Sequence, residues 1–181
     1  WGRPIGINCM QDVMVCREVL TNLLTACETL GISDPKEAKW LDMLSKLPAV
    51  LLDETTGALR EYGWDAIKED LDHRHVSHHH DVWPGHAINW EETPELALAV
   101  LKSNRRRGME NESYHGLAMR LFTAIRLKDE SHATSLIKEI LEHGFVNRTL
   151  LTSHNPNTRG AQSDAQGSLP AVLAEMAVYS K

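Results

Sequence analysis

Apolar residues recur every three or four positions in six segments of this chain, which is the spacing of an amphipathic helix with one buried side. The helices predicted from this spacing cover residues 8–30, 34–47, 93–107, 115–127 and 131–143, with a last one that opens at residue 168. In that last helix the positions expected to face inward are Val172, Leu173 and Met176.

Local start and stop signals support these helices. Asp34-Pro35-Lys36-Glu37 reads as an N-cap, a proline in the first turn and a capping-box glutamate, and Thr93-Pro94-Glu95 is a start signal of the same kind. Gly31 and Gly144 are typical helix ends. Ser168-Leu169-Pro170 is interpreted as the start of the last helix.

No segment alternates apolar and polar residues for long enough to predict a strand, so the fold class is all-α, in a single domain over residues 1–181. Short turns at 31–34 and 128–130 predict an array of antiparallel helical hairpins. Residues 48–92 and 145–167 form much longer connections. Such loops are usually disordered or functional, and the aromatic, histidine and proline content of these two favours function.

Charge and hydropathy exclude two classes of partner. The formal net charge is −6, and the only basic run, residues 105–107, is expected to end a helix and offset its dipole, so nucleic acid is not a partner. No apolar run approaches the length of a membrane span, which argues against a membrane partner. The chain begins at Trp1 without a methionine, as an excised piece of a longer protein would.

Three cysteines, Cys9, Cys16 and Cys27, fall on nearly one face of the first predicted helix. Residues that far apart on a straight helix cannot form disulfides with one another. We interpret them as small core residues.

Residues 73–80 read His-Arg-His-Val-Ser-His-His-His and hold five of the chain's ten histidines. Imidazole and guanidinium groups suit a polyhydroxylated or anionic ligand, proton transfer or a metal. Convergence of His73, His75 and His78 on zinc is an alternative, although their spacing is no established zinc motif. A solvated histidine loop is a further alternative, and the density of the cluster favours ligand binding.

Carboxylates in the two long loops are the other candidates for chemistry. Glu61 lies beside Tyr62 in a glycine-bounded, aromatic-rich stretch, where it either binds sugar hydroxyls, acts as an acid with a raised pKa, or neutralises Arg60 or Arg74. Asp164 either caps the last helix or serves the same cleft as His154. The chain has no glycine-rich phosphate loop, Gly-x-Ser-x-Gly elbow or Cys-His nucleophile pair, which leaves hydrolysis through carboxylates and ordered polar groups.

Several of these motifs together resemble the C-terminal half of the catalytic domain of glycoside hydrolase family 95, the α-L-fucosidases. Residues 57–62 resemble its Gly-x-Leu-Gln-Glu-Trp element, and residues 73–78 match its His-Arg-His-x-Ser-His motif almost letter for letter. Residues 84–85 and 93–96 follow at the expected distances. The match around Asp164 is weaker.

The resemblance implies about half of an (α/α)6 barrel and inverting hydrolysis of terminal α-L-fucosides or α-L-galactosides in glycans, without a cofactor or a metal. It implies that an asparagine upstream of this chain activates the water and is polarised by Asp164, while an upstream glutamate is the acid. Glu61, His73, Arg74, His75, His78 and His154 then bind substrate. Members of the family are secreted or periplasmic.

The sequence departs from the family in ways that affect the expected pocket. His79-His80 stands where Leu-Tyr is usual and predicts a more polar wall, and Ser163 and Ala165-Gln166 flank Asp164 where Ile and Gly-Asn are usual. Tyr114-His115, interpreted mainly as a helix start, replaces part of a common Gly-Trp-Ser and leaves open a substrate other than a plain fucoside.

Two other functions remain as alternatives. One is a non-catalytic helical module that binds carbohydrate or a protein, and the other is a metal-dependent hydrolase built on the histidines. As a half-barrel without its N-terminal half, the isolated chain should be inactive and should expose apolar helix faces, so we expect self-association or poor solubility.

Overall fold

The computed structural model describes residues 6–108, 113–158 and 161–178 of the chain. In these ranges the order of helices is α1 (Met10–Leu30), α2 (Glu37–Lys46), the short 3-10 helix η1 (Ser77–His79), α3 (Pro94–Arg105), α4 (Tyr114–Arg126), α5 (Glu130–Glu142) and α6 (Ser163–Ala177). Extended pairing within them is limited to isolated bridges, such as that between Cys9 and Tyr62. The all-α class is confirmed.

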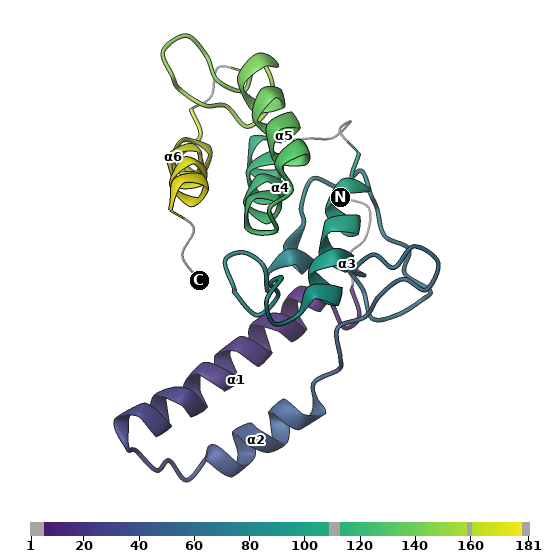
Figure 1. The fold of residues 1–181 in the computed structure, drawn as a ribbon, viewed down its shortest axis with the longest axis vertical. Helices are drawn as coiled ribbons and strands as arrows, with labels where there is room; N and C mark the ends of the chain where they lie inside the picture. Colours follow the sequence, from purple (N-terminus) through teal and green to yellow (C-terminus); the bar gives the residue numbers. More distant parts are fainter. Residues whose placement is uncertain (1–5, 109–112, 159–160, 179–181) are drawn as a thin grey trace.

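Two helical units make up the molecule. α4 packs against both α5 and α6, while α1 and α2 form a hairpin that projects from the body, with α3 between the two units (Figure 1). One core cluster, which includes Leu117, Phe122 and Leu136, lies among α4, α5 and α6. A second, which includes Met10, Leu59 and Val100, joins the start of α1, the long loop and α3.

The predicted start signals lie near the first residues of α2 and α3, although α2 begins at Glu37 with Lys36, not Asp34, at its N-cap. The amide of Asp34 donates to the Glu37 carboxylate over 2.7 Å, one half of the predicted capping box. Ser113 caps α4 by accepting the amide of Gly116, and Asp129 caps α5 by accepting that of His132. Pro94 occupies the first helical position of α3, as predicted.

The predicted start of α6 is wrong. The helix begins at Ser163, five residues before the predicted start, and carries Pro170 in its interior. Ala165, in the first turn, is completely buried in the α4–α5–α6 core, so packing extends the helix beyond the Ser-Leu-Pro signal. The predicted inward face is also only partly right: Val172 is buried, but Leu173 and Met176 are 54% and 51% exposed.

The cysteines are not core residues, contrary to the sequence-based interpretation. Cys16 is exposed, Cys9 and Cys27 are half-buried, and all three are free thiols. The buried residues of α1 end at Leu20, because the rest of the helix packs along α2, which has no buried residue of its own. The helical spacing of apolar residues in α1 therefore extends beyond the part of the helix that is buried in the core.

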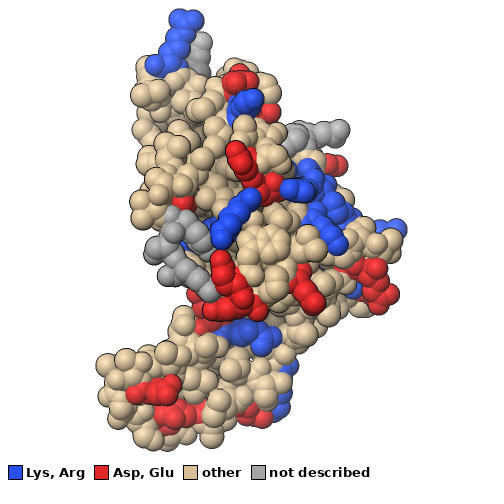
Figure 2. Space-filling model, viewed as in Figure 1, with Lys and Arg blue, Asp and Glu red and all other residues tan. Residues whose placement is uncertain are grey.

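Charged side chains of both signs are interspersed on the face shown in Figure 2, over the body and the α1–α2 hairpin alike. Within the three described ranges, every helix is too short or too polar to cross a bilayer.

Candidate functional site

Glu61 is held where the long loop crosses the start of α1. The amide of Met10 donates to the carbonyl of Glu61 over 2.9 Å, and Cys9 and Tyr62 form an antiparallel bridge beside it. The Glu61 side chain is 13% exposed, and its Oε2 lies 3.4 Å from Arg107 Nη2. Burial raises the pKa of the Glu61 carboxyl, and the positive charge of Arg107 opposes that rise.

The predicted neutralising partners of Glu61 were Arg60 and Arg74, and the structure supplies Arg107 instead. Arg60 pairs with the exposed Asp65. Arg74 is half-buried, and its charge is one of the causes that lower the pKa of His75.

Arg107 organises this region from just after the end of α3. Its side chain is 1% exposed, and its Nη1 donates to the carbonyls of Asp70 over 2.8 Å and His73 over 3.2 Å. Its Nη2 faces Glu61 and lies 3.5 Å from His78 Nε2. One buried guanidinium therefore fixes the backbone before the histidine segment and the carboxylate that faces it.

His78 and His79 point into the protein. η1 turns both side chains inward, where each is 1% exposed and where their Nε2 atoms lie 2.9 and 3.1 Å from the same Ser103 Oγ. Burial, the first cause, and the nearby Arg107 charge lower the pKa of both rings well below the usual range, so both are neutral at pH 7. The expected polar pocket wall at His79 is wrong, since that ring lies in the core.

His80, the other residue of that expected wall, contacts a carboxylate on α1. Its Nε2 lies 2.7 Å from Glu18 Oε2 on α1. The pair joins the histidine segment to the projecting hairpin.

His73 and His75 turn away from the core and meet a third ring. The centroids of His73 and His75 are 5.0 Å apart, and His115 at the start of α4 lies 5.5 Å from His75. Burial, followed by the neighbouring His73 and His115, lowers the pKa of His75 to about 4. At neutral pH His75 is an uncharged ring that can donate one hydrogen bond and accept another.

The second long loop brings His154 to the same place. The amide of Tyr114 donates to the His154 carbonyl over 2.9 Å, and the His154 ring lies 3.0 Å from Gln162 Nε2, at the N-cap of α6. Asp164 follows in the first turn of α6, but its side chain lies outside the described residues. Gln162, not Asp164, is the N-cap residue.

The histidines do not form a metal-binding arrangement. Where the structure describes the chain, no three His, Cys, Asp or Glu side chains are grouped so that they could hold an ion. His78 contacts Ser103 while His73 and His75 face His115, so these three rings do not converge. This geometry counts against the zinc alternative.

A pocket of about 140 Å³ opens beside Glu61 and is lined by residues from around the start of α1 and from η1. The residues that line it are Cys9, Gln11, Asp12, Glu61, Tyr62, Ser77 and His78. The pocket presents carboxylates, a hydroxyl and a phenol, the groups that bind sugar hydroxyls.

Three residues of this region were not identified from the sequence as functional. Arg107 was interpreted only as part of a helix end, Ser103 was not singled out, and His115 was interpreted mainly as a helix start. The available signal for Arg107 was that Arg105 already places a cation in the last turn of α3, so a further arginine after the helix was not needed to offset the dipole. For His115, the signal was its place in a Gly-Trp-Ser position of the resembled family.

Comparison with known proteins agrees with this architecture. The family model of the glycosyl hydrolase family 95 catalytic domain matches residues 2–177. The chain therefore belongs to glycosyl hydrolase family 95, whose catalytic domain is an α/α barrel. Alpha-L-fucosidase 2 of Arabidopsis thaliana is 30% identical over 192 residues, which cover 99% of this chain and 22% of that protein. The chain thus spans about a fifth of the length of this relative.

Proposed function

We propose that this chain is part of the catalytic domain of an inverting exo-glycosidase that hydrolyses terminal α-L-fucosides or α-L-galactosides. The observation that carries the proposal is the meeting of His73, His75 and His115, with His154 nearby, from segments that are distant in the sequence. The family match and the similarity to an alpha-L-fucosidase support the substrate class.

In this proposal the histidines bind the sugar and do not transfer protons. A ring with a pKa of about 4 is almost wholly neutral at pH 7, so it offers a donor and an acceptor to adjacent hydroxyls. Glu61, with Arg107 behind it, accepts a hydroxyl of the same substrate. Arg74 and His78 complete the set, His78 through the small pocket beside Glu61.

Asp164 is proposed as the residue that polarises an asparagine of the complete enzyme, which in turn activates the water. Its position in the first turn of α6, two residues after the Gln162 that contacts His154, supports this role. In an inverting reaction the acid and the water-activating group stand farther apart than the roughly 5 Å of retaining enzymes. General acid–base chemistry with a positioned water needs no cofactor.

The test is hydrolysis of an aryl α-L-fucoside by the full-length protein that contains this chain, followed by proton NMR of the first product. Inversion predicts β-L-fucose before mutarotation, and α-L-fucose as first product refutes it. The 181-residue chain should release no fucose above the blank rate. Activity of this chain alone would mean that the acid and base lie within it.

Two substitutions in the full-length protein separate the roles. Asp164→Asn keeps the shape and removes the charge, so kcat should fall by about a hundredfold or more. His75→Phe removes hydrogen bonds to the substrate, so KM should rise with little change in kcat. Wild-type turnover by a folded Asp164→Asn variant would reduce Asp164 to a structural residue.

A further inference from the structure

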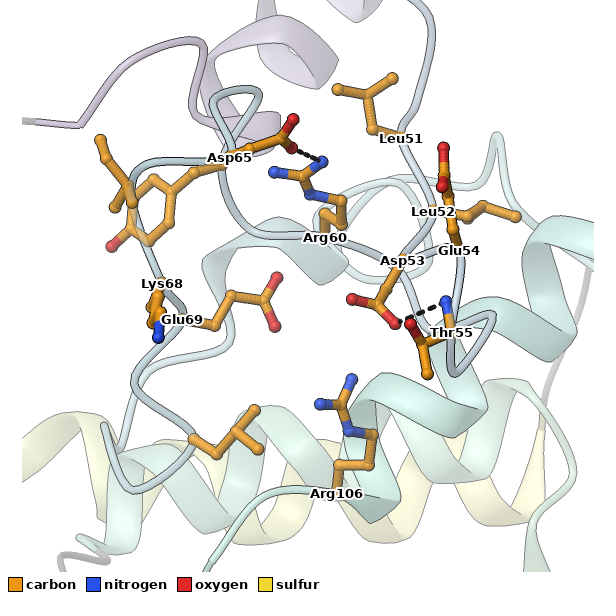
Figure 3. Close-up of a pocket in the computed structure, with 13 residues that line it drawn as sticks. Leu51, Leu52, Asp53, Glu54, Thr55, Arg60, Asp65, Lys68, Glu69 and Arg106 are labelled. Carbon is orange, nitrogen blue, oxygen red and sulfur yellow. Dashed lines mark hydrogen bonds and ion pairs between the residues drawn. The ribbon is translucent and has the colours of Figure 1, made fainter.

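A second pocket, larger than the one beside Glu61, is shown in Figure 3. It has a volume of about 600 Å³ and is bounded by residues 51–55, by parts of residues 60–71 and by Arg106 after the end of α3. This volume is within the roughly 300–1,000 Å³ typical of ligand sites.

The backbone separates this pocket from the one beside Glu61. Residues 59–62 lie between the bridges Leu52–Leu59 and Cys9–Tyr62, with a bend at Glu61. Arg60 lines the large pocket, whereas Glu61 lines the small one. Tyr62 is the one residue that borders both.

Charges of both signs line the large pocket in similar numbers. The carboxylates belong to Asp53, Glu54, Asp65 and Glu69, and the cations belong to Arg60, Lys68 and Arg106. Figure 3 shows Arg60 paired with Asp65 on one side, with Arg106 facing Glu69 and Asp53 across the cavity. A strongly anionic ligand would meet the carboxylates and a cationic one the guanidinium groups, so neither is favoured.

A neutral, hydroxyl-rich ligand fits this lining. Each sugar hydroxyl donates one hydrogen bond and accepts others, and therefore needs carboxylates and cations close together. The apolar wall of Leu51, Leu71 and the Tyr62 ring can pack against the C–H faces of pyranose rings.

We propose that the pocket of residues 51–55, 60–71 and Arg106 is a second carbohydrate site, which binds a neutral oligosaccharide segment separately from the Glu61 pocket. This goes beyond the proposed hydrolysis, because the site takes no part in bond cleavage. It gives the chain a second point of attachment to a glycan.

The experiment is a titration of the ¹⁵N-labelled 181-residue chain, followed by amide chemical shifts. The probes are cellobiose and lactose as neutral disaccharides, digalacturonate as an anionic one, and L-fucose. Both neutral disaccharides should give saturable shifts at residues 51–55 and 65–71. Arg106→Ala removes a charged donor and should weaken their binding about tenfold. Thr55→Trp places a bulky ring in the pocket wall and should abolish binding.

Lys138→Ala on α5 is the matched control, an exposed cation away from the pocket, and should bind like wild type. The proposal is overturned if neutral disaccharides shift residues 73–78 instead, if only digalacturonate binds, if no neutral probe gives saturable shifts, or if Arg106→Ala and Thr55→Trp both bind normally. L-fucose reports on the other site: failure of the full-length protein to bind L-fucose, with cellobiose still bound to the 181-residue chain, counts against the proposed function alone.

Discussion

Acid should destabilise this protein well above the pH at which its carboxylates titrate, because His78 and His79 are buried as neutral rings. Both share the Ser103 hydroxyl and lie close to the Arg107 guanidinium. A proton on either ring would place a second positive charge in this buried site. The unfolded chain has no such restriction, and there both rings take up protons near pH 6.5.

The magnitude follows from linkage. The folded pKa of both rings is lowered, so between pH 6.5 and that value the unfolded state binds more protons and stability falls as the pH falls. Each ring contributes about 1.4 kcal/mol between pH 7.5 and 5.5, so the pair costs about 3 kcal/mol. That is a large part of the roughly 5–15 kcal/mol by which domains are stable.

A His79→Gln variant isolates this contribution. Glutamine keeps a polar group near Ser103 but does not titrate, so the variant should lose about 1.4 kcal/mol less than wild type over the same range. The opposing effects of Glu61 and Asp81, whose pKa values are raised by burial, cancel in the difference. Urea unfolding followed by tryptophan fluorescence at pH 7.5 and 5.5 measures both proteins. Equal losses would show that the His79 ring is protonated in the folded state.

Other substitutions probe the core, the guanidinium and the exposed faces. Phe122→Ala removes a buried ring that stacks on Trp83 with a centroid distance of 4.0 Å, so the free energy of unfolding in urea should fall by about 3–5 kcal/mol. Leu173 is 54% exposed, so Leu173→Ala should change that free energy by no more than about 0.5 kcal/mol. Similar losses in the two variants would contradict the packing of α6. Arg107→Met leaves the Glu61 carboxylate without its buried partner, so the free energy of unfolding should fall by about 3 kcal/mol and the Glu61 pKa should rise. If ¹³C NMR showed an unchanged titration of the Glu61 carboxyl, Arg107 would not act on Glu61. Exposed apolar side chains on α1, α2 and α6 predict concentration-dependent self-association, and a monomer at all concentrations in sedimentation would count against a partial barrel.

Local signals predicted the helices well where the cap residues and the packing agree. Thr93-Pro94-Glu95 opens α3 at the predicted position, with Pro94 first in the helix, and α4 begins at Tyr114, one residue before its predicted start, where Ser113 caps it. α6 shows the opposite case. Its first turn is fixed by the burial of Ala165 against another helix, and sequence spacing within one segment contains no information on that contact.

The histidine segment was recognised as a candidate site, but the direction of each ring was not predictable. His73 and His75 face His115, while the turn of η1 sends His78 and His79 to Ser103. Irregular backbone has no period from which an inward face can be derived. The partners that decide these directions, Ser103 and His115, belong to helices far along the chain.

The arginine run shows the same limit most directly. Helix geometry rotates successive residues by about 100°, so three adjacent side chains at a helix end point in different directions. Arg105 pairs with Asp129 at the N-cap of α5, Arg106 donates to Thr56 beside the large pocket, and Arg107 enters the core to face Glu61. The helix dipole explains why cations are favoured there, but only Arg105 lies within α3. One turn of chain thus contributes one arginine each to the start of α5, to the proposed second carbohydrate site and to the candidate active site.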